Sequence, residues 1–153
     1  MTELDGVMGD VSRLTWIAER SPEAVHSGLA IFAPSLAGLD VLLSDRVVTD
    51  DPEYFQGSAV LGEKYVVKFA WAEAPARRMV HEARVLSALA TCEEPLPVPQ
   101  LIASSSAPAM LVTLLVPGDP LVDPDLLEPS RRSRLADDLG RFLVSCIRDS
   151  CAI

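Results

Sequence analysis

The chain has 153 residues, of which 49% are hydrophobic and 23% are charged, and its formal net charge at pH 7 is −9. This length and apolar content suffice for the core of one domain, and no apolar run is long enough to span a membrane. The negative charge argues against nucleic acid as a partner, because binding to phosphates needs basic patches.

Neither the N-terminus nor the cysteines indicate export. The first residues lack the basic start and apolar stretch of a secretory signal. Cys92, Cys146 and Cys151 form no even framework and lack the spacing of metal ligands. His26 and His81 are too few and too scattered for a metal site. We therefore expect a cytoplasmic protein with reduced thiols and without a metal site.

The first forty residues are predicted to be helical. Asp10 can cap a short helix that carries Leu14 and Ile17. Ser21 is a clearer start signal for a second helix, because Pro22 then takes the first helical position and Glu23 lies in the first turn. We expect these helices to cover one face of a sheet. The buried side of the second helix would consist of Val25 and Leu29.

From residue 41 the sequence becomes β-like. Residues 41–43 and 46–48 flank a predicted tight turn, and a further strand is expected over residues 55–61 with Gly57 and Ser58 at its opening end. A glycine there would let the backbone approach a phosphate, to which the Ser58 hydroxyl and the amides could donate. An ordinary turn is the alternative.

The strongest strand pattern covers residues 65–71, which are aromatic and β-branched around one lysine. Because alternate side chains point to opposite faces, Lys68 shares its face with Val66 and Ala70, and the aromatic side chains occupy the other face. A lysine between small aliphatic residues needs an acidic partner. Alternatively, this strand lies at a sheet edge and the lysine reaches water.

Residues 74–90 supply that partner. They are good helix formers, with a proline near the start, and their apolar residues fall on one arc. Glu82 lies inside this arc, between Met79 and Leu86. A buried carboxylate without a partner costs about 3–5 kcal/mol, so we predict an ion pair between Lys68 and Glu82. A glutamate at the rim of the apolar stripe is the alternative.

The remainder predicts two strands and one more helix. A proline-rich loop precedes a short strand over residues 100–103 and a polar turn over residues 104–108. Residues 109–116 form the most apolar strand, which should be central, and Pro117 and Gly118 end it. Three acids at 123, 125 and 128 lack the pattern of a calcium loop. Ser130 then caps a helix that should pack beneath the sheet through Leu135, Leu139, Phe142, Leu143 and Cys146.

This order of elements, with short connections between strands, predicts an α+β fold with an antiparallel sheet. We expect a helical segment at 1–40, a sheet-containing lobe at 41–118, and a linker with the first helix of a further lobe at 119–153.

The series resembles the N-terminal lobe of the aminoglycoside phosphotransferase family, within the kinase-like superfamily. The similarity covers roughly residues 55–143. The motifs that carry it are Tyr65-Val66-Val67-Lys68-Phe69, His81-Glu82-Ala83-Arg84-Val85-Leu86, Leu96-Pro97-Val98-Pro99, Leu111-Val112-Thr113, Val116-Pro117-Gly118-Asp119-Pro120-Leu121 and Leu139-Gly140-Arg141-Phe142-Leu143.

The resemblance implies an ATP site. Lys68, held by Glu82, would contact the α- and β-phosphates, and Gly57 and Ser58 would lie in the nucleotide-positioning loop. Val66 would form part of the roof over the adenine. Thr113 would lie at the position that controls access to the back pocket. Leu114 and Val116 would lie on the hinge, whose backbone pairs with the adenine.

The departure from the family concerns catalysis. The family's catalytic loop, of the type His-x-Asp with a later Asn, and its Mg²⁺ ligands lie in the second lobe. This sequence has no histidine after His81 and no asparagine, so we assign no catalytic residue and no metal ligand. The residues after Leu143 also differ from the family pattern, as a frameshift or premature stop would produce.

Our first hypothesis is the nucleotide-binding lobe of an ATP- and Mg²⁺-dependent phosphotransferase that acts on a small-molecule hydroxyl such as that of an antibiotic. We expect this chain to be inactive alone and to self-associate through surface that a second lobe would cover. The alternatives are a non-catalytic nucleotide- or partner-binding module and an α+β domain whose ion pair is purely structural.

Overall fold

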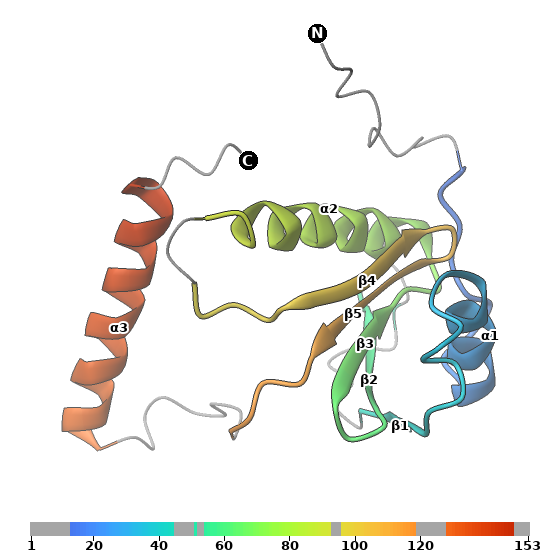
Figure 1. The fold of residues 1–153 in the computed structure, drawn as a ribbon, viewed down its shortest axis with the longest axis horizontal. Helices are drawn as coiled ribbons and strands as arrows, with labels where there is room; N and C mark the ends of the chain where they lie inside the picture. Colours follow the sequence, from blue (N-terminus) through green and yellow to red (C-terminus); the bar gives the residue numbers. More distant parts are fainter. Residues whose placement is uncertain (1–12, 45–50, 52–53, 93–95, 119–127, 149–153) are drawn as a thin grey trace, which may run out of the picture.

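The structure, a computed structural model, describes residues 13–44, 51, 54–92, 96–118 and 128–148 (Figure 1). Five strands form one antiparallel sheet in the order β1-β2-β3-β5-β4, which confirms the predicted α+β class. In chain order the elements are α1 (Pro22–Phe32), β1 (Val41–Leu43), β2 (Gly57–Leu61), β3 (Tyr65–Phe69), α2 (Glu73–Leu89), β4 (Leu101–Ser106), β5 (Ala109–Leu114) and α3 (Pro129–Arg148).

Helix α1 begins as the sequence predicts. The Ser21 side chain accepts a hydrogen bond from the Ala24 N–H at 3.2 Å, and Pro22 occupies the first turn, where its missing N–H costs nothing. Val25 and Leu29 are fully buried against one sheet face. The predicted cover over the aromatic face of β3 is thereby confirmed for this helix.

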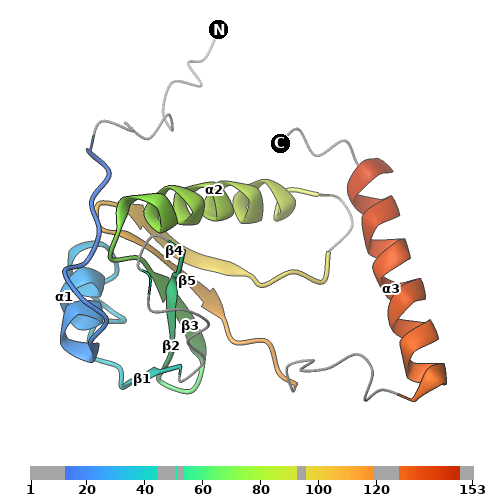
Figure 2. The ribbon, with the colours of Figure 1, turned by 180° about the vertical axis from the view of Figure 1, so that it is seen from behind.

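The sheet separates two apolar cores. On one face α1 packs over Val67 and Phe69 of β3. On the other face α2 lies mainly over β5 and β4, with Met79 in contact with a cluster that includes Ala70 and Leu111. Figures 1 and 2, which view the molecule from opposite sides, both show α2 running across the sheet. The sheet therefore has a helix on each face, with a separate apolar core beneath each helix.

The predicted short helix over residues 14–17 is wrong. The Thr15 N–H donates to the Ser106 carbonyl at 3.0 Å, and the Thr15 carbonyl accepts from the Ala109 N–H at 2.7 Å. The Ile17 N–H donates to the Ala70 carbonyl at 3.1 Å. These backbone groups bind the end of the sheet and cannot also form helical hydrogen bonds. The proposed cap, Asp10, lies outside the described residues.

Strand β4 is longer than predicted. The sequence suggested a polar turn over residues 104–108, but the strand continues to Ser106 and only Ala107 and Pro108 form the turn. Ser104 is exposed and Ser105 and Ser106 are half-buried, so these serine side chains reach water from within the strand. The other boundaries differ by a few residues, and the predicted strand over 46–48 lies outside the described residues.

Helix α3 does not pack beneath the sheet, so that prediction is wrong. It stands apart from the other elements (Figures 1 and 2). Leu139 and Leu143 are 53% and 59% exposed. The apolar stripe predicted its helical structure, but no element in the described part of the chain provides a surface that buries this stripe.

The thiol prediction is corrected at one residue. Cys92, just beyond the end of α2, is disulfide-bonded, so the expectation of three reduced cysteines is wrong there. The side chains of Cys146 and Cys151 lie outside the described part of the structure. Among the described residues, no helix combines the length and the apolar character needed to cross a membrane.

Candidate nucleotide site

The predicted ion pair is present. Nζ of Lys68, in β3, lies 2.5 Å from Oε1 of Glu82, in α2. The alternative of an edge strand does not hold, because β3 lies between β2 and β5. The two side chains are 32% and 31% exposed, so the pair remains reachable from solvent. The helix carboxylate thus fixes the ammonium group at a partly open surface.

Four predicted site residues lie on one face of the sheet. In the antiparallel register Ser58 is opposite Lys68, and Thr113 is opposite Val66. Cross-strand partners point to the same face, and that face also carries the ion pair. Ser58 and Val66 are half-buried, whereas Thr113 is only 5% exposed. The register therefore places a hydroxyl, an aliphatic side chain and the ammonium group together.

Gly57 faces the opposite side of the sheet. A Cβ atom at this residue would lie 2.3 Å from Cε2 of Phe69 and 2.9 Å from Cζ3 of Trp71. The two aromatic rings pack at a centroid distance of 5.9 Å. The missing side chain therefore makes room for aromatic rings in the α1-side core. A role of Gly57 at a phosphate remains a prediction.

The predicted hinge follows the end of β5. The Leu114 N–H donates to the Gln100 carbonyl and the Leu115 N–H donates to the Lys64 carbonyl, both at 2.9 Å. Val116 is 59% exposed, and within the described residues its N–H has no backbone hydrogen-bond partner. Of the amides at residues 114–116, those of Leu114 and Leu115 are used by the protein, and no described residue binds that of Val116.

These residues fit part of an ATP molecule. A lysine fixed by a carboxylate suits phosphate oxygens, and an exposed backbone amide suits a base edge. The described residues do not offer a comparable set of ligands for Mg²⁺. No group of three or more His, Cys, Asp or Glu residues in the described part of the chain is arranged to hold a metal ion.

One interaction near this site was not predicted. The Arg20 guanidinium donates to the Ser44 carbonyl at the end of β1, and the Ser44 N–H donates to the Ser58 carbonyl at 2.9 Å. Arg20 therefore holds the strand that is hydrogen-bonded to Ser58. No sequence signal identifies this contact, because it joins the segment before α1 to a strand distant in sequence.

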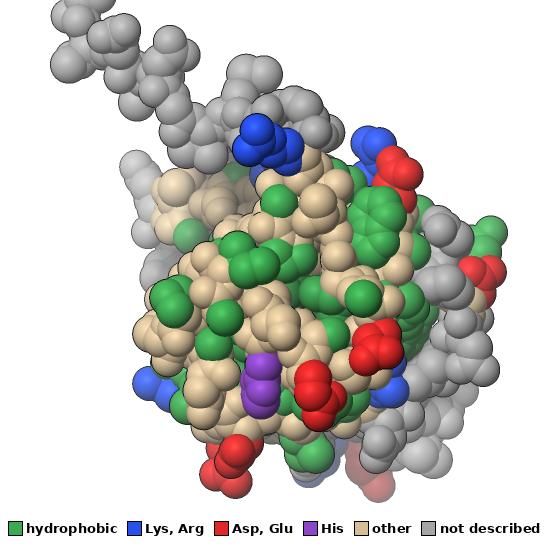
Figure 3. Space-filling view, turned by 90° about the vertical axis from the view of Figure 1, so that its right-hand side faces the viewer, with side chains coloured by type: hydrophobic (Ala, Val, Ile, Leu, Met, Phe, Trp, Pro, Cys, Tyr) green, Lys and Arg blue, Asp and Glu red, His purple; other side chains and the backbone are tan. Residues whose placement is uncertain are grey.

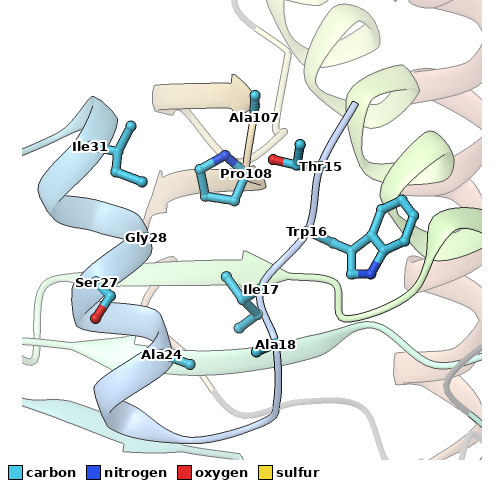
Figure 4. A pocket seen from close by; sticks show the side chains of 10 residues that line it. All are labelled: Thr15, Trp16, Ile17, Ala18, Ala24, Ser27, Gly28, Ile31, Ala107 and Pro108. Carbon is cyan, nitrogen blue, oxygen red and sulfur yellow. The ribbon is translucent and has the colours of Figure 1, made fainter. Parts of the chain in front are cut away.

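A separate hollow lies on the α1 side of the sheet. Its volume is about 390 Å³, and Figure 4 shows it between α1, the extended segment with Thr15 and Ile17, and the turn at Pro108. Figure 3 shows hydrophobic side chains interspersed with polar surface on this side of the molecule. None of the predicted site residues lines this hollow.

A comparison with solved structures found a protein of similar fold. A solved structure of the streptomycin-ATP-APH(2")-IIa ternary complex aligns with 79% of this chain at a TM-score of 0.56 and 18% identity. At this identity the similarity concerns the fold, which is kinase-like, and the aligned region spans 38% of that structure's chain. The comparison with curated proteins gave no match.

The family comparison is independent of that structural match. The model of the phosphotransferase enzyme family, APH, matches residues 48–146. This range contains β2, β3, α2, β4 and β5, and with them both members of the ion pair. Because the match spans more than half of the length of this chain, the chain belongs to the phosphotransferase enzyme family.

Proposed function

We propose that this chain is the nucleotide-binding lobe of an ATP-dependent phosphotransferase whose acceptor is the hydroxyl group of a small molecule. Within it, Lys68 binds the α- and β-phosphates and Glu82 holds the lysine in place. Ser58 and Val66 lie against the nucleotide, Thr113 limits the depth of the adenine pocket, and the hinge at Leu114 and Val116 binds the adenine edge.

The observation that carries this proposal is the ion pair between β3 and α2. A strand lysine at 2.5 Å from a helix carboxylate is the arrangement that orients ATP phosphates in kinases. The pair is about one-third exposed, which leaves room for a ligand to approach. A purely structural pair at this exposure would contribute only about 0–1 kcal/mol to stability.

Transfer of the phosphoryl group needs further residues. A group must orient the acceptor hydroxyl and Mg²⁺ must be held at the phosphates. The sequence offers no asparagine and no histidine after His81 for these roles. We therefore propose that the 153-residue chain binds nucleotide and does not by itself transfer phosphate.

The test is a titration of Mg-ATP followed by calorimetry, with wild type, Lys68→Ala and Lys64→Ala. Lys64 is the matched control, because it is an exposed lysine of the same hairpin, with Nζ 5.3 Å from the centroid of the Tyr65 ring. We expect saturable binding by wild type and Lys64→Ala, and loss of most of the binding in Lys68→Ala.

The outcomes separate the alternatives. Equal binding in all three proteins, or none in wild type, would contradict a nucleotide role for the ion pair. Tight binding without any turnover of ATP would favour a non-catalytic nucleotide-binding module. Turnover with a hydroxyl acceptor that disappears in Lys68→Ala would overturn the proposal that this chain is inactive alone.

We also propose that the apolar stripe of α3 mediates self-association. Leu139, Leu143 and Val144 are 53%, 59% and 46% exposed, and exposed apolar surface of this kind marks an interaction site. Light scattering should show a concentration-dependent rise in mass that Leu139→Ser with Leu143→Ser reduces. A monomer at all concentrations would contradict self-association and leave the nucleotide proposal intact.

A further inference from the structure

A second candidate site lies on the outward side of α2, away from the ion pair. A hollow of about 170 Å³ is lined by Leu14, Val80 and three side chains that can carry positive charge, Arg77, His81 and Arg84. The three recur at positions i, i+4 and i+7, so they project from one side of the helix. Glu82, which directly follows His81 in the sequence, points instead to Lys68.

The charge of this surface is opposite to that of the chain. The formal net charge is −9, with 13 Lys and Arg residues against 22 Asp and Glu residues. On the outward side of α2, Arg77, His81 and Arg84 are all exposed. The acid that faces them from the same helix is Glu73, which binds Arg77 at 2.5 Å.

Two of the three side chains have no polar partner among the residues that the structure describes. His81 and Arg84 make no ion pair or side-chain hydrogen bond within the described part of the chain. Leu14 and Val80 supply an apolar wall beside them and belong to the α2-side core. An apolar wall lowers the local dielectric constant and strengthens the attraction between a guanidinium group and an anion.

The size of the hollow restricts the ligand. A volume of about 170 Å³ equals roughly five or six water molecules at about 30 Å³ each. A phosphate ion or a single phosphoryl group fits within this volume, whereas a whole nucleotide does not fit inside it. Arginine also matches the geometry of phosphate and carboxylate oxygens, to which it can donate two parallel hydrogen bonds.

We propose that the outward side of α2 is an oxyanion site in which Arg84 and His81, with Arg77 at the rim, bind a phosphate-sized group. The site is separate from the proposed nucleotide site, because it lies on the other side of the helix from Glu82. Its ligand is a free phosphate or the phosphoryl group of a larger molecule, and both present the same oxygens to Arg84.

The test uses the ring signals of the two histidines in NMR spectra of the full chain. His81 lines the hollow. His26 is an internal control, because it belongs to α1, on the opposite face of the sheet from α2, and its Nε2 lies 3.0 Å from the Leu39 carbonyl oxygen. Sodium phosphate is titrated at fixed pH and fixed ionic strength, with chloride as the balancing anion, and phosphoserine is titrated separately.

Saturable movement of the His81 signals with phosphate, and constant His26 signals, are expected. Arg84→Gln should weaken phosphate binding by about tenfold or more, since a hydrogen bond to a charged group contributes about 1.5–3 kcal/mol. Arg131→Gln, an exposed arginine of α3, is the matched control and should bind phosphate as wild type does. Tighter binding of phosphoserine than of phosphate would indicate the phosphoryl group of a larger ligand.

Lys68→Met separates this proposal from the nucleotide proposal, because it removes the lysine of the ion pair and leaves the hollow intact. Phosphate should move the His81 signals equally in this variant. The oxyanion site is refuted if phosphate gives no saturable change, if both histidines respond alike, or if Arg84→Gln binds phosphate as wild type does. Loss of the phosphate-induced change of the His81 signals in Lys68→Met would show that the oxyanion site is not separate from the nucleotide site.

Discussion

The two faces of β3 differ in what they bury. The face toward α1 carries Val67 and Phe69, which have no exposed surface. The face toward α2 carries Val66 and Lys68, which remain half-buried. Because side chains alternate along a strand, neighbouring residues of one five-residue element belong to a closed core and to a partly open surface. One face stabilises the fold, and the other carries the proposed nucleotide site.

The largest expected effect comes from removing the aromatic ring at the centre of the closed face. Phe69→Ala should lower the free energy of unfolding by about 3–5 kcal/mol, because it leaves a cavity among fully buried side chains. Urea unfolding followed by circular dichroism measures this change. A loss below about 1 kcal/mol would mean that the ring is not packed as described, since large-to-small core changes exceed that value.

A smaller loss of stability is expected from adding a methyl group to the same face. Gly57→Ala would bring Cβ to 2.3 Å from the Phe69 ring, and overpacking of this kind lowers stability by about 1–3 kcal/mol. Gly38→Ala is the matched control, because nothing lies within 4 Å of its added Cβ. Equal unfolding free energies for both variants would contradict the packing role of Gly57.

The smallest change in stability is expected on the open face. Lys68→Met should alter the free energy of unfolding by only about 0–1 kcal/mol, because the partly exposed pair is screened by water. The same variant should lose most of its Mg-ATP binding. A large loss of stability with unchanged nucleotide binding would reverse the division of roles between the two faces.

Residues close in sequence made the ion pair predictable. The alternation over residues 65–71 and the position of Glu82 within the apolar arc of its helix were sufficient to predict the ion pair, because a strand and the next helix are adjacent in the fold. The Ser21 cap likewise predicted α1 from local chemistry. Local periodicity and capping therefore account for the elements and for their first contacts.

Long-range contacts were not predictable in the same way. Residues 14–17 have no pattern that indicates hydrogen bonds to Ser106, Ala109 and Ala70, so the apolar spacing suggested a helix. The stripe of α3 predicted a helix correctly but not the absence of a covering surface among the described elements. The aromatic rings that require a glycine at residue 57 belong to Phe69, in β3, and to Trp71, just after β3. In each case the deciding partner lies elsewhere in the chain.

The extended segment before α1 has a consequence for the order of folding. Leu14 packs with the α2-side core and Ile17 belongs to the α1-side core, while Thr15 is bonded to both arms of the β4–β5 hairpin. These residues are synthesised before the β4–β5 hairpin to which they bind. Since contacts between distant parts of a chain slow folding, we expect this join to form last and to make the two layers unfold as one cooperative unit.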